Sequence, residues 1–134
     1  IRPQDNGYKT DTRWIALSNE NKNGLLFVSD SENHLSFSAL HMENEDFDTT
    51  PGLDYDNSNK SKHTIDIKEK DLVQLNIDLG QRGLAGDDSW WSNPMEKYQF
   101  KGNQKHGYSF YIIPFENKTA DDFIPLSKTF YNQN

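Results

Sequence analysis

Apolar and polar residues alternate along several short segments of the chain. In the three clearest segments, residues 35–39, 73–79 and 108–113, every second side chain is apolar. A strand with one buried face has this period of two, so each segment predicts a half-buried β-strand. Two shorter apolar runs, Trp14 to Leu17 and Leu25 to Val28, predict two further strands.

The segments between these strands predict turns rather than long helices. Asn23-Gly24 lies between the two shorter runs and predicts a hairpin turn. Only Glu43 to Asp48 suggests a short helical turn, a polar stretch over residues 56–62 predicts an exposed loop, and residues 115–134 carry no motif. Short strands joined by turns predict an all-β fold, an antiparallel β-sandwich. The length of 134 residues fits a single domain over residues 1–134.

Composition excludes several kinds of partner. The formal net charge is -7 and no run of Lys or Arg is present, whereas nucleic-acid binding needs a basic surface. The same charge disfavours an anionic membrane surface, and no apolar segment approaches the ~20 residues that span a bilayer. With no cysteine, the chain cannot form disulfides or thiolate metal sites. We therefore expect neither a nucleic-acid nor a membrane partner.

One segment, residues 81–91, has a composition that no core strand or helix requires. It combines two glycines, two aspartates, a serine and two tryptophans. Ionised aspartates offer only hydrogen-bond acceptors, and an indole is a large flat apolar surface. Sugars carry hydroxyl groups on their rim and C–H groups on one face, so this mixture predicts a carbohydrate-contacting loop.

Three ordered blocks, one of which contains this loop, resemble the C-terminal domain of the large bacterial β-galactosidases of glycoside hydrolase family two. The first block is R-P-Q-D-N-G at residues 2–7, followed by T-D-T-R-W at residues 10–14. The second comprises Phe37-Ser38-Ala39-Leu40, residues 46–48 and His63. The third runs from Leu75-Asn76-Ile77-Asp78 through Gln81-Arg82-Gly83 to Gly86-Asp87-Asp88-Ser89-Trp90, with Pro94 and Tyr98 after it. The resemblance extends from Arg2 to about Pro114.

This resemblance implies a fold and a parent protein. The fold would be the C-terminal part of a galactose-mutarotase-like supersandwich, and the chain a C-terminal fragment of a larger multidomain glycosidase. Its start at Ile1, without an initiator methionine, agrees with that expectation. The parent would be a retaining enzyme that hydrolyses terminal β-D-galactosides such as lactose, expected to be a homo-oligomer with Mg²⁺ or Na⁺ in its catalytic domain. The compartment, cytoplasmic or periplasmic, stays open.

The resemblance also implies what this chain contributes. In the family, this domain closes over the mouth of a catalytic barrel in the same polypeptide, and the tryptophan of the Gly-Asp-Asp-Ser-Trp motif stacks on the sugar. That role falls on Trp90, with Asp88 and Trp91 as further candidates for substrate binding. Neighbouring side chains on an extended loop point in opposite directions, so one of the two indoles is expected to pack inward. Arg82, Ala85 and Trp91 depart from the family pattern, which has methionine, glycine and a small residue there.

Other roles for these residues remain open. Trp90 could pack as a lid on the core, and Asp87 and Asp88 could shape the loop by binding backbone N–H groups. The pair Asp11 and Arg13 is expected to be structural, near the Asn6-Gly7 turn. A free-standing carbohydrate-binding module is the alternative to a glycosidase fragment, and a domain that only buttresses the barrel is a third possibility.

We expect no catalytic residue and no metal ligand in this chain. A retaining glycosidase needs two carboxyl groups about 5–5.5 Å apart, one of them with a raised pKa. The acids here cluster in polar, loop-like segments, where solvated surface is the usual explanation. The four histidines, His34, His41, His63 and His106, show no metal-binding spacing. The resemblance places both catalytic carboxylates in the barrel, so the isolated fragment is predicted to be inactive.

Overall fold

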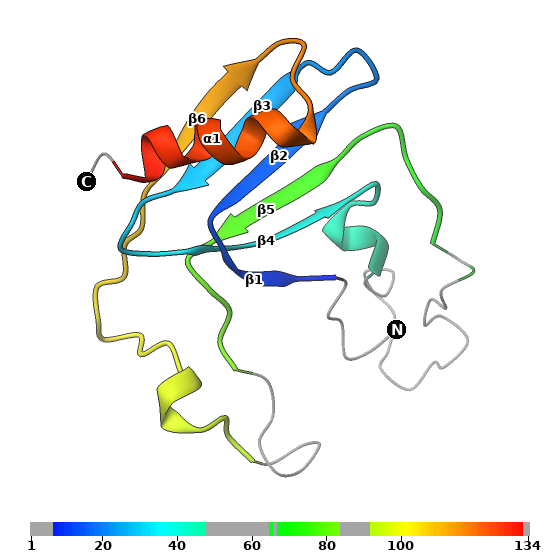
Figure 1. Cartoon of the computed structure of the whole chain (residues 1–134). Coiled ribbons are helices and arrows are strands. Elements are labelled where there is room, and N and C mark those ends of the chain that lie inside the picture. The colour runs from blue at the N-terminus through cyan, green and yellow to red at the C-terminus, as the bar shows by residue number, and fades with distance from the viewer. Residues whose placement is uncertain (1–6, 48–64, 66, 84–91, 133–134) are drawn as a thin grey trace. The chain divides into compact units, whose positions relative to one another are not determined.

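The computed structural model describes residues 7–47, 65, 67–83 and 92–132 (Figure 1). Within it the chain forms two compact units, each treated by itself below. The first unit comprises residues 1–9 and 37–77, and the second comprises residues 10–36 and 78–134.

The second unit is built on an antiparallel sheet of three strands. These are β2 (Trp14–Ser18), β3 (Gly24–Ser29) and β6 (Phe110–Phe115), and β3 lies in the centre of the order β2-β3-β6. The register pairs Ala16 with Leu26 on one side of β3 and Ile113 with Leu26 on the other. Strand β3 is also the most buried of the three, as expected for the central strand of a sheet.

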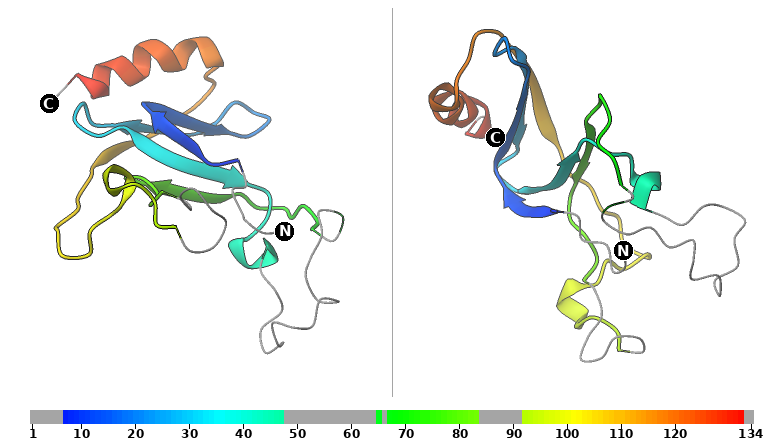
Figure 2. Two further views of the ribbon diagram at one scale, coloured as in Figure 1. Left: turned by 90° about the horizontal axis from the view of Figure 1, so that it is seen from below. Right: turned by 90° about the vertical axis from the view of Figure 1, so that its right-hand side faces the viewer.

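A single helix covers one face of this sheet. Helix α1 (Ala120–Tyr131) lies along β2, β3 and β6 in each of the views of Figures 1 and 2. Buried Leu26 and Val28 of β3 form a core cluster with Phe115 and Phe123. The Phe123 ring lies 4.8 Å from that of Phe115 and 5.9 Å from that of Trp14, between centroids. Burial of these aromatic rings therefore holds the helix on the sheet.

Local interactions define the start of α1. At its start, the backbone N–H of Thr119 donates to Oδ2 of Asp122 at 2.8 Å, an arrangement typical of a capping box. This hydrogen bond is the main reason why the pKa of the Asp122 carboxyl lies below its usual value. Pro125 lies inside the helix, where it removes one backbone donor. The aromatic contacts of Phe123 compensate for that loss.

A five-residue connection, Asn19 to Asn23, joins β2 to β3. Oδ1 of Asn19 accepts the backbone N–H groups of Asn21 at 3.0 Å and Asn23 at 3.1 Å, which closes the turn. Gly24 pairs with Ser18 as the first residue of β3. A Cβ atom there would lie 1.8 Å from the carbonyl oxygen of Leu17, so the chain requires glycine because the strands approach so closely. The predicted hairpin is confirmed, with Asn23-Gly24 at its end rather than its centre.

The first unit contains most of a second three-stranded sheet with the order β1-β4-β5. Its strands are β1 (Lys9–Thr12), β4 (Leu35–Leu40) and β5 (Gln74–Asp78). Nδ2 of Asn76 donates to Oγ of Ser38 at 2.9 Å. The 3-10 helix η1 (Asn44–Phe47) follows β4, and Nζ of Lys70 lies 2.5 Å from Glu43 and 2.7 Å from Asp46. Both carboxylates keep the pKa of Lys70 above its usual value.

The prediction of an all-β fold is confirmed, since strands in two sheets dominate the described residues and the β2–β3 and β3–β6 pairs are antiparallel. All five predicted strands are present within a few residues of their expected bounds, and η1 occupies the expected helical turn. Three described elements were not expected, namely strand β1, the 3-10 helix η4 (Glu96–Tyr98) and helix α1. In the part of the chain that the structure describes, no helix is both long and apolar enough to cross a membrane. The supersandwich stays a prediction.

Candidate functional site

The predicted sugar-binding residues Trp90, Trp91 and Asp88 lie outside the described residues, as does Asp87. The structure describes the chain on both sides of this loop. One side is the segment after β5, ending at Gly83, and the other begins at Ser92 and includes the 3-10 helix η4 (Glu96–Tyr98). We call these two segments, which flank residues 84–91 in the chain, the loop neck.

The two sides of the loop neck are joined by hydrogen bonds. The backbone N–H of Gly83 donates to the carbonyl oxygen of Tyr98 at 2.7 Å. Nη2 of Arg82 lies 3.5 Å from Oδ1 of Asn93, which adds a weaker contact next to it. These hydrogen bonds hold the segment that ends at Gly83 against the segment that contains Asn93 and Tyr98.

Close packing at the loop neck explains its glycine. A Cβ atom on Gly83 would lie 2.7 Å from Cβ of Tyr98 and 3.1 Å from Cβ of Pro94. Pro94 is buried, and its carbonyl oxygen accepts Nε2 of Gln99 at 2.6 Å, so it has little freedom to move away. Gly83 is therefore required for the approach of the two segments and not for an unusual backbone angle.

Gly83→Ala is expected to open the loop neck. The added methyl group collides with Tyr98 and Pro94, so the hydrogen bond from residue 83 to the Tyr98 carbonyl lengthens or breaks. Amide hydrogen exchange at residue 83 should become at least about ten-fold faster if this bond contributes ~1.5 kcal/mol of local stability. Gly107→Ala is the matched control, because an added Cβ meets nothing within 4 Å there. Equal exchange at residue 83 in the wild type and Gly83→Ala would contradict this account of the neck.

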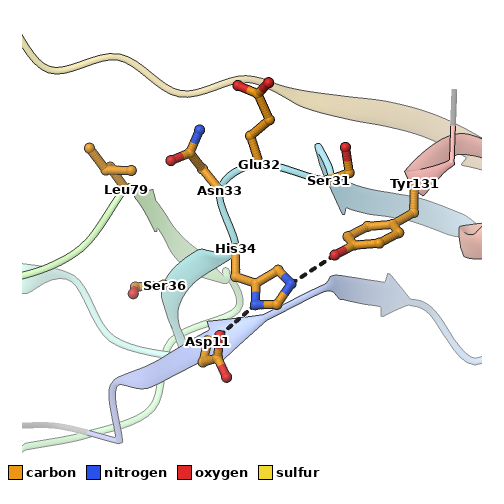
Figure 3. A pocket seen from close by; sticks show the side chains of 8 residues that line it. All are labelled: Asp11, Ser31, Glu32, Asn33, His34, Ser36, Leu79 and Tyr131. Carbon is orange, nitrogen blue, oxygen red and sulfur yellow. Dashed lines mark hydrogen bonds and ion pairs between the residues drawn. The ribbon is translucent and has the colours of Figure 1, made fainter. Parts of the chain in front are cut away.

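A polar pocket of about 520 Å³ lies elsewhere in the second unit, around His34 (Figure 3). Figure 3 shows the imidazole between two partners, the carboxylate of Asp11 and the phenol of Tyr131. Nδ1 of His34 contacts Oδ1 of Asp11, and Nε2 lies 3.0 Å from the Tyr131 hydroxyl. The other lining residues are Ser31, Glu32, Asn33, Ser36 and Leu79. Through His34, the C-terminal end of α1 is connected to β1.

Charge in this pocket is mainly negative. The hydrogen bond and charge of His34, with a smaller effect of Arg13, keep the pKa of the Asp11 carboxyl below its usual value. Asp11 has a φ of 56°, in the left-handed region that aspartate tolerates better than most residues. Asp11 and Arg13, which the sequence predicted to be structural, thus act together near His34. Both ring nitrogens of His34 are engaged, one by Asp11 and the other by Tyr131.

Buried Asp30 shapes the loop beside the pocket. Its Oδ1 accepts the backbone N–H groups of Glu32 at 3.0 Å and Asn33 at 2.6 Å, and its Oδ2 accepts the hydroxyl of Ser109 at 2.6 Å. These bonds stabilise the carboxylate, and the hydroxyl of Ser109 contributes most to a pKa of Asp30 below its usual value. Asp30 is 6% exposed, so water has little access to replace these hydrogen bonds.

The Asp30 network predicts a pH dependence of stability. Because the folded-state pKa is lowered, the ionised carboxylate stabilises the fold above the unfolded pKa of about 3.9, and this contribution disappears as the pH falls through the lower folded pKa. Asp30→Asn should therefore be less stable at pH 7 and lose less free energy of unfolding below pH ~4. Urea unfolding curves across this range would measure both effects. Glu20→Gln, an exposed site, is the control, and an unchanged acid slope in Asp30→Asn would refute the assignment.

Comparison with known proteins identifies the family. The family model described as the beta galactosidase small chain matches residues 1–112. The chain belongs to this family. Curated relatives include the beta-galactosidase of Priestia megaterium, 26% identical over 117 residues, with 85% of this chain and 10% of the relative covered. The beta-galactosidase of Streptococcus thermophilus is 25% identical over 114 residues, covering 85% of this chain and 10% of the relative.

In a third relative, the matched shares of this chain and of the relative are similar. The beta-galactosidase of Photobacterium profundum is 26% identical over 117 residues, with 87% of this chain and 9% of the relative covered. The chain therefore spans about a tenth of the length of the curated relatives that it matches. No solved structure matches it significantly.

Two observations bear on the chemistry of the acidic residues in the described part of this beta galactosidase small chain domain. No group of three or more His, Cys, Asp and Glu side chains gathers among residues 7–47, 65, 67–83 and 92–132. The carboxyl groups of Asp11, Asp30 and Asp122 each have a pKa below its usual value. A general acid of a glycosidase needs the opposite shift.

The cluster of His34, Asp11 and Tyr131 was not predicted from the sequence. His34 lies 23 positions from Asp11 and 97 positions from Tyr131 along the chain, and no spacing rule connects them. In the sequence, the one indication of this cluster was the position of Asp11 within the T-D-T-R-W block at residues 10–14.

Proposed function

We propose that this chain is the C-terminal domain of a β-galactosidase that hydrolyses terminal β-D-galactosides such as lactose. The observation that carries the proposal is the family match over residues 1–112, together with its small share of each relative. The domain supplies a wall of the active site. Its binding residue is Trp90, whose indole stacks on the apolar face of the sugar, with Asp88 and Trp91 beside it.

The loop neck supports this role. The described residues on either side of residues 84–91 are joined by the hydrogen bond from Gly83 to Tyr98. A binding loop whose two flanking segments are held together loses less entropy on binding than one whose flanking segments are free, which suits a residue that must stack on a weakly bound sugar. Asp88 contributes acceptors for sugar hydroxyl groups or shapes the loop.

Bond cleavage belongs to another part of the same polypeptide. In retaining glycosidases one carboxylate attacks the anomeric carbon while a carboxylic acid protonates the leaving oxygen, and the resulting glycosyl-enzyme is then hydrolysed. The lowered carboxyl pKa values of Asp11, Asp30 and Asp122 do not fit the acid. Both catalytic groups, with any Mg²⁺ or Na⁺, are assigned to a barrel domain that this domain covers, within a homo-oligomeric enzyme.

The test compares the natural polypeptide that carries this chain with the 134-residue chain alone. The full polypeptide should hydrolyse o-nitrophenyl β-D-galactoside and lactose, whereas the isolated chain should neither hydrolyse them nor bind methyl β-D-galactoside measurably. A full polypeptide without galactosidase activity would contradict the proposal. Sugar binding by the isolated chain would instead favour a free-standing carbohydrate-binding module.

A further inference from the structure

A second cavity, of about 610 Å³, lies between helix α1 and the strands that it covers. It is lined by Arg13, Trp14, Val28, Ile124, Ser127, Lys128, Tyr131 and Asn132. The lining residues of α1, and Asn132 after it, lie beyond residue 112, where the family match ends. The cavity, which we call the helix cavity, is therefore formed jointly by the family segment and by the segment that follows it.

The wall of the helix cavity is apolar on both sides. Val28 of β3 is fully buried at its base, and Trp14 lies next to Val28 in the β2–β3 register. Ile124 of α1 is 53% exposed, although an aliphatic side chain gains free energy when it leaves water. An apolar group in the cavity would cover Ile124 and pack against the indole of Trp14.

Two cations, Arg13 and Lys128, line the same cavity, and no acidic residue does. Both are exposed, and neither side chain has an ion pair or hydrogen bond with another described residue. Arg13 acts on Asp11 only through its charge, and Lys128, in the last turn of α1, complements the helix dipole. The cavity therefore combines apolar walls with positive charge, in a chain whose formal net charge is -7.

We propose that the helix cavity binds a small amphiphilic monocarboxylate. Its hydrocarbon part contacts Trp14, Val28 and Ile124, and its carboxylate interacts with Arg13 and Lys128. Guanidinium groups bind carboxylates through two parallel hydrogen bonds, and the ammonium group adds a second positive charge. A neutral sugar fits this lining poorly because the cations would have no anionic partner, so the ligand class differs from that of the sugar-binding loop.

Calorimetric titration of the natural polypeptide with octanoate tests the proposal. Octan-1-ol and octylammonium serve as neutral and cationic probes with the same hydrocarbon chain. Octanoate should bind at least about five-fold more tightly than octan-1-ol, which corresponds to ~1 kcal/mol from the charged contacts, and octylammonium should bind more weakly still. Raising the ionic strength should weaken octanoate binding, because these cations are exposed.

Variants locate the binding. Lys128→Gln should raise the Kd of octanoate about five-fold, whereas Lys105→Gln, which removes the same charge from an exposed position outside the cavity, should leave it unchanged. Ile124→Asp places a negative charge in the wall and should abolish binding without removing a buried core residue. The proposal is overturned if octanoate does not bind, if octan-1-ol binds equally well, or if Lys128→Gln and Ile124→Asp have no effect.

Discussion

Trp90→Ala in the natural polypeptide is expected to raise the KM for lactose about ten-fold while kcat falls by less. Stacking of an indole on the sugar contributes ~1–3 kcal/mol, judged from the burial of a large aromatic side chain. The contact is made in both the bound ground state and the transition state, so its loss appears mainly in KM. Steady-state kinetics with lactose and with o-nitrophenyl β-D-galactoside would measure the two constants separately.

The matched control is Trp91→Ala, which removes the same side chain from the neighbouring position. Since adjacent residues of an extended loop point in opposite directions, only one of the two substitutions should affect sugar binding directly. Unchanged kinetics in Trp90→Ala would reject its stacking role. A large change in KM only for Trp91→Ala would assign the stacking role to Trp91 instead. The proposal that this domain forms a wall of the active site would still stand.

Phe123→Ala is expected to destabilise the second unit by about 3–5 kcal/mol, the usual cost of removing a buried phenylalanine ring. Phe123 is 6% exposed, and its ring contacts those of Phe115 and Trp14. Its loss leaves a cavity between α1 and the sheet that neither element fills. Because Pro125 already weakens the helix, α1 has little intrinsic stability to resist detachment.

Urea unfolding monitored by far-UV circular dichroism would measure this effect. Ile124→Ala, one residue further along α1 and 53% exposed, is the control and should cost less than about 1 kcal/mol. If both substitutions cost the same, the packing of Phe123 does not hold the helix on the sheet, and another contact has that role.

The strands were predictable because their signal is local. The period-two patterns of Leu35 to Ala39 and Val73 to Leu79 lie within the strands themselves, although β5 has no fully buried residue and Val73 is 45% exposed. The loop neck was visible only through its glycine. The sequence identified Gly83 as part of a motif, but its reason, the approach of Tyr98 and Pro94, depends on residues from the far side of the loop.

Helix α1 was missed for a specific reason. Phe123, Leu126 and Phe130 follow helical spacing, and Thr119 with Asp122 forms a cap, but Pro125 interrupts this pattern and no motif was recognised in residues 115–134. Pairwise packing against Leu26 and Val28 overrides the cost of that proline. The packing energy that stabilises the helix comes from contacts with β3, which is about a hundred residues away in the chain. No local sequence pattern therefore reveals it.

By itself, the sequence determined the all-β class, the positions of the strands, the family to which the chain belongs and the loop proposed to bind sugar. Each depends on local alternation or on residues that follow one another in a motif. Only the tertiary structure decided that α1 covers β3, that His34 joins Asp11 to Tyr131, and that Arg13 and Lys128 share a cavity with Trp14. These arrangements depend on contacts between distant segments, whose free energies are settled by packing in three dimensions rather than by the order of residues along the chain.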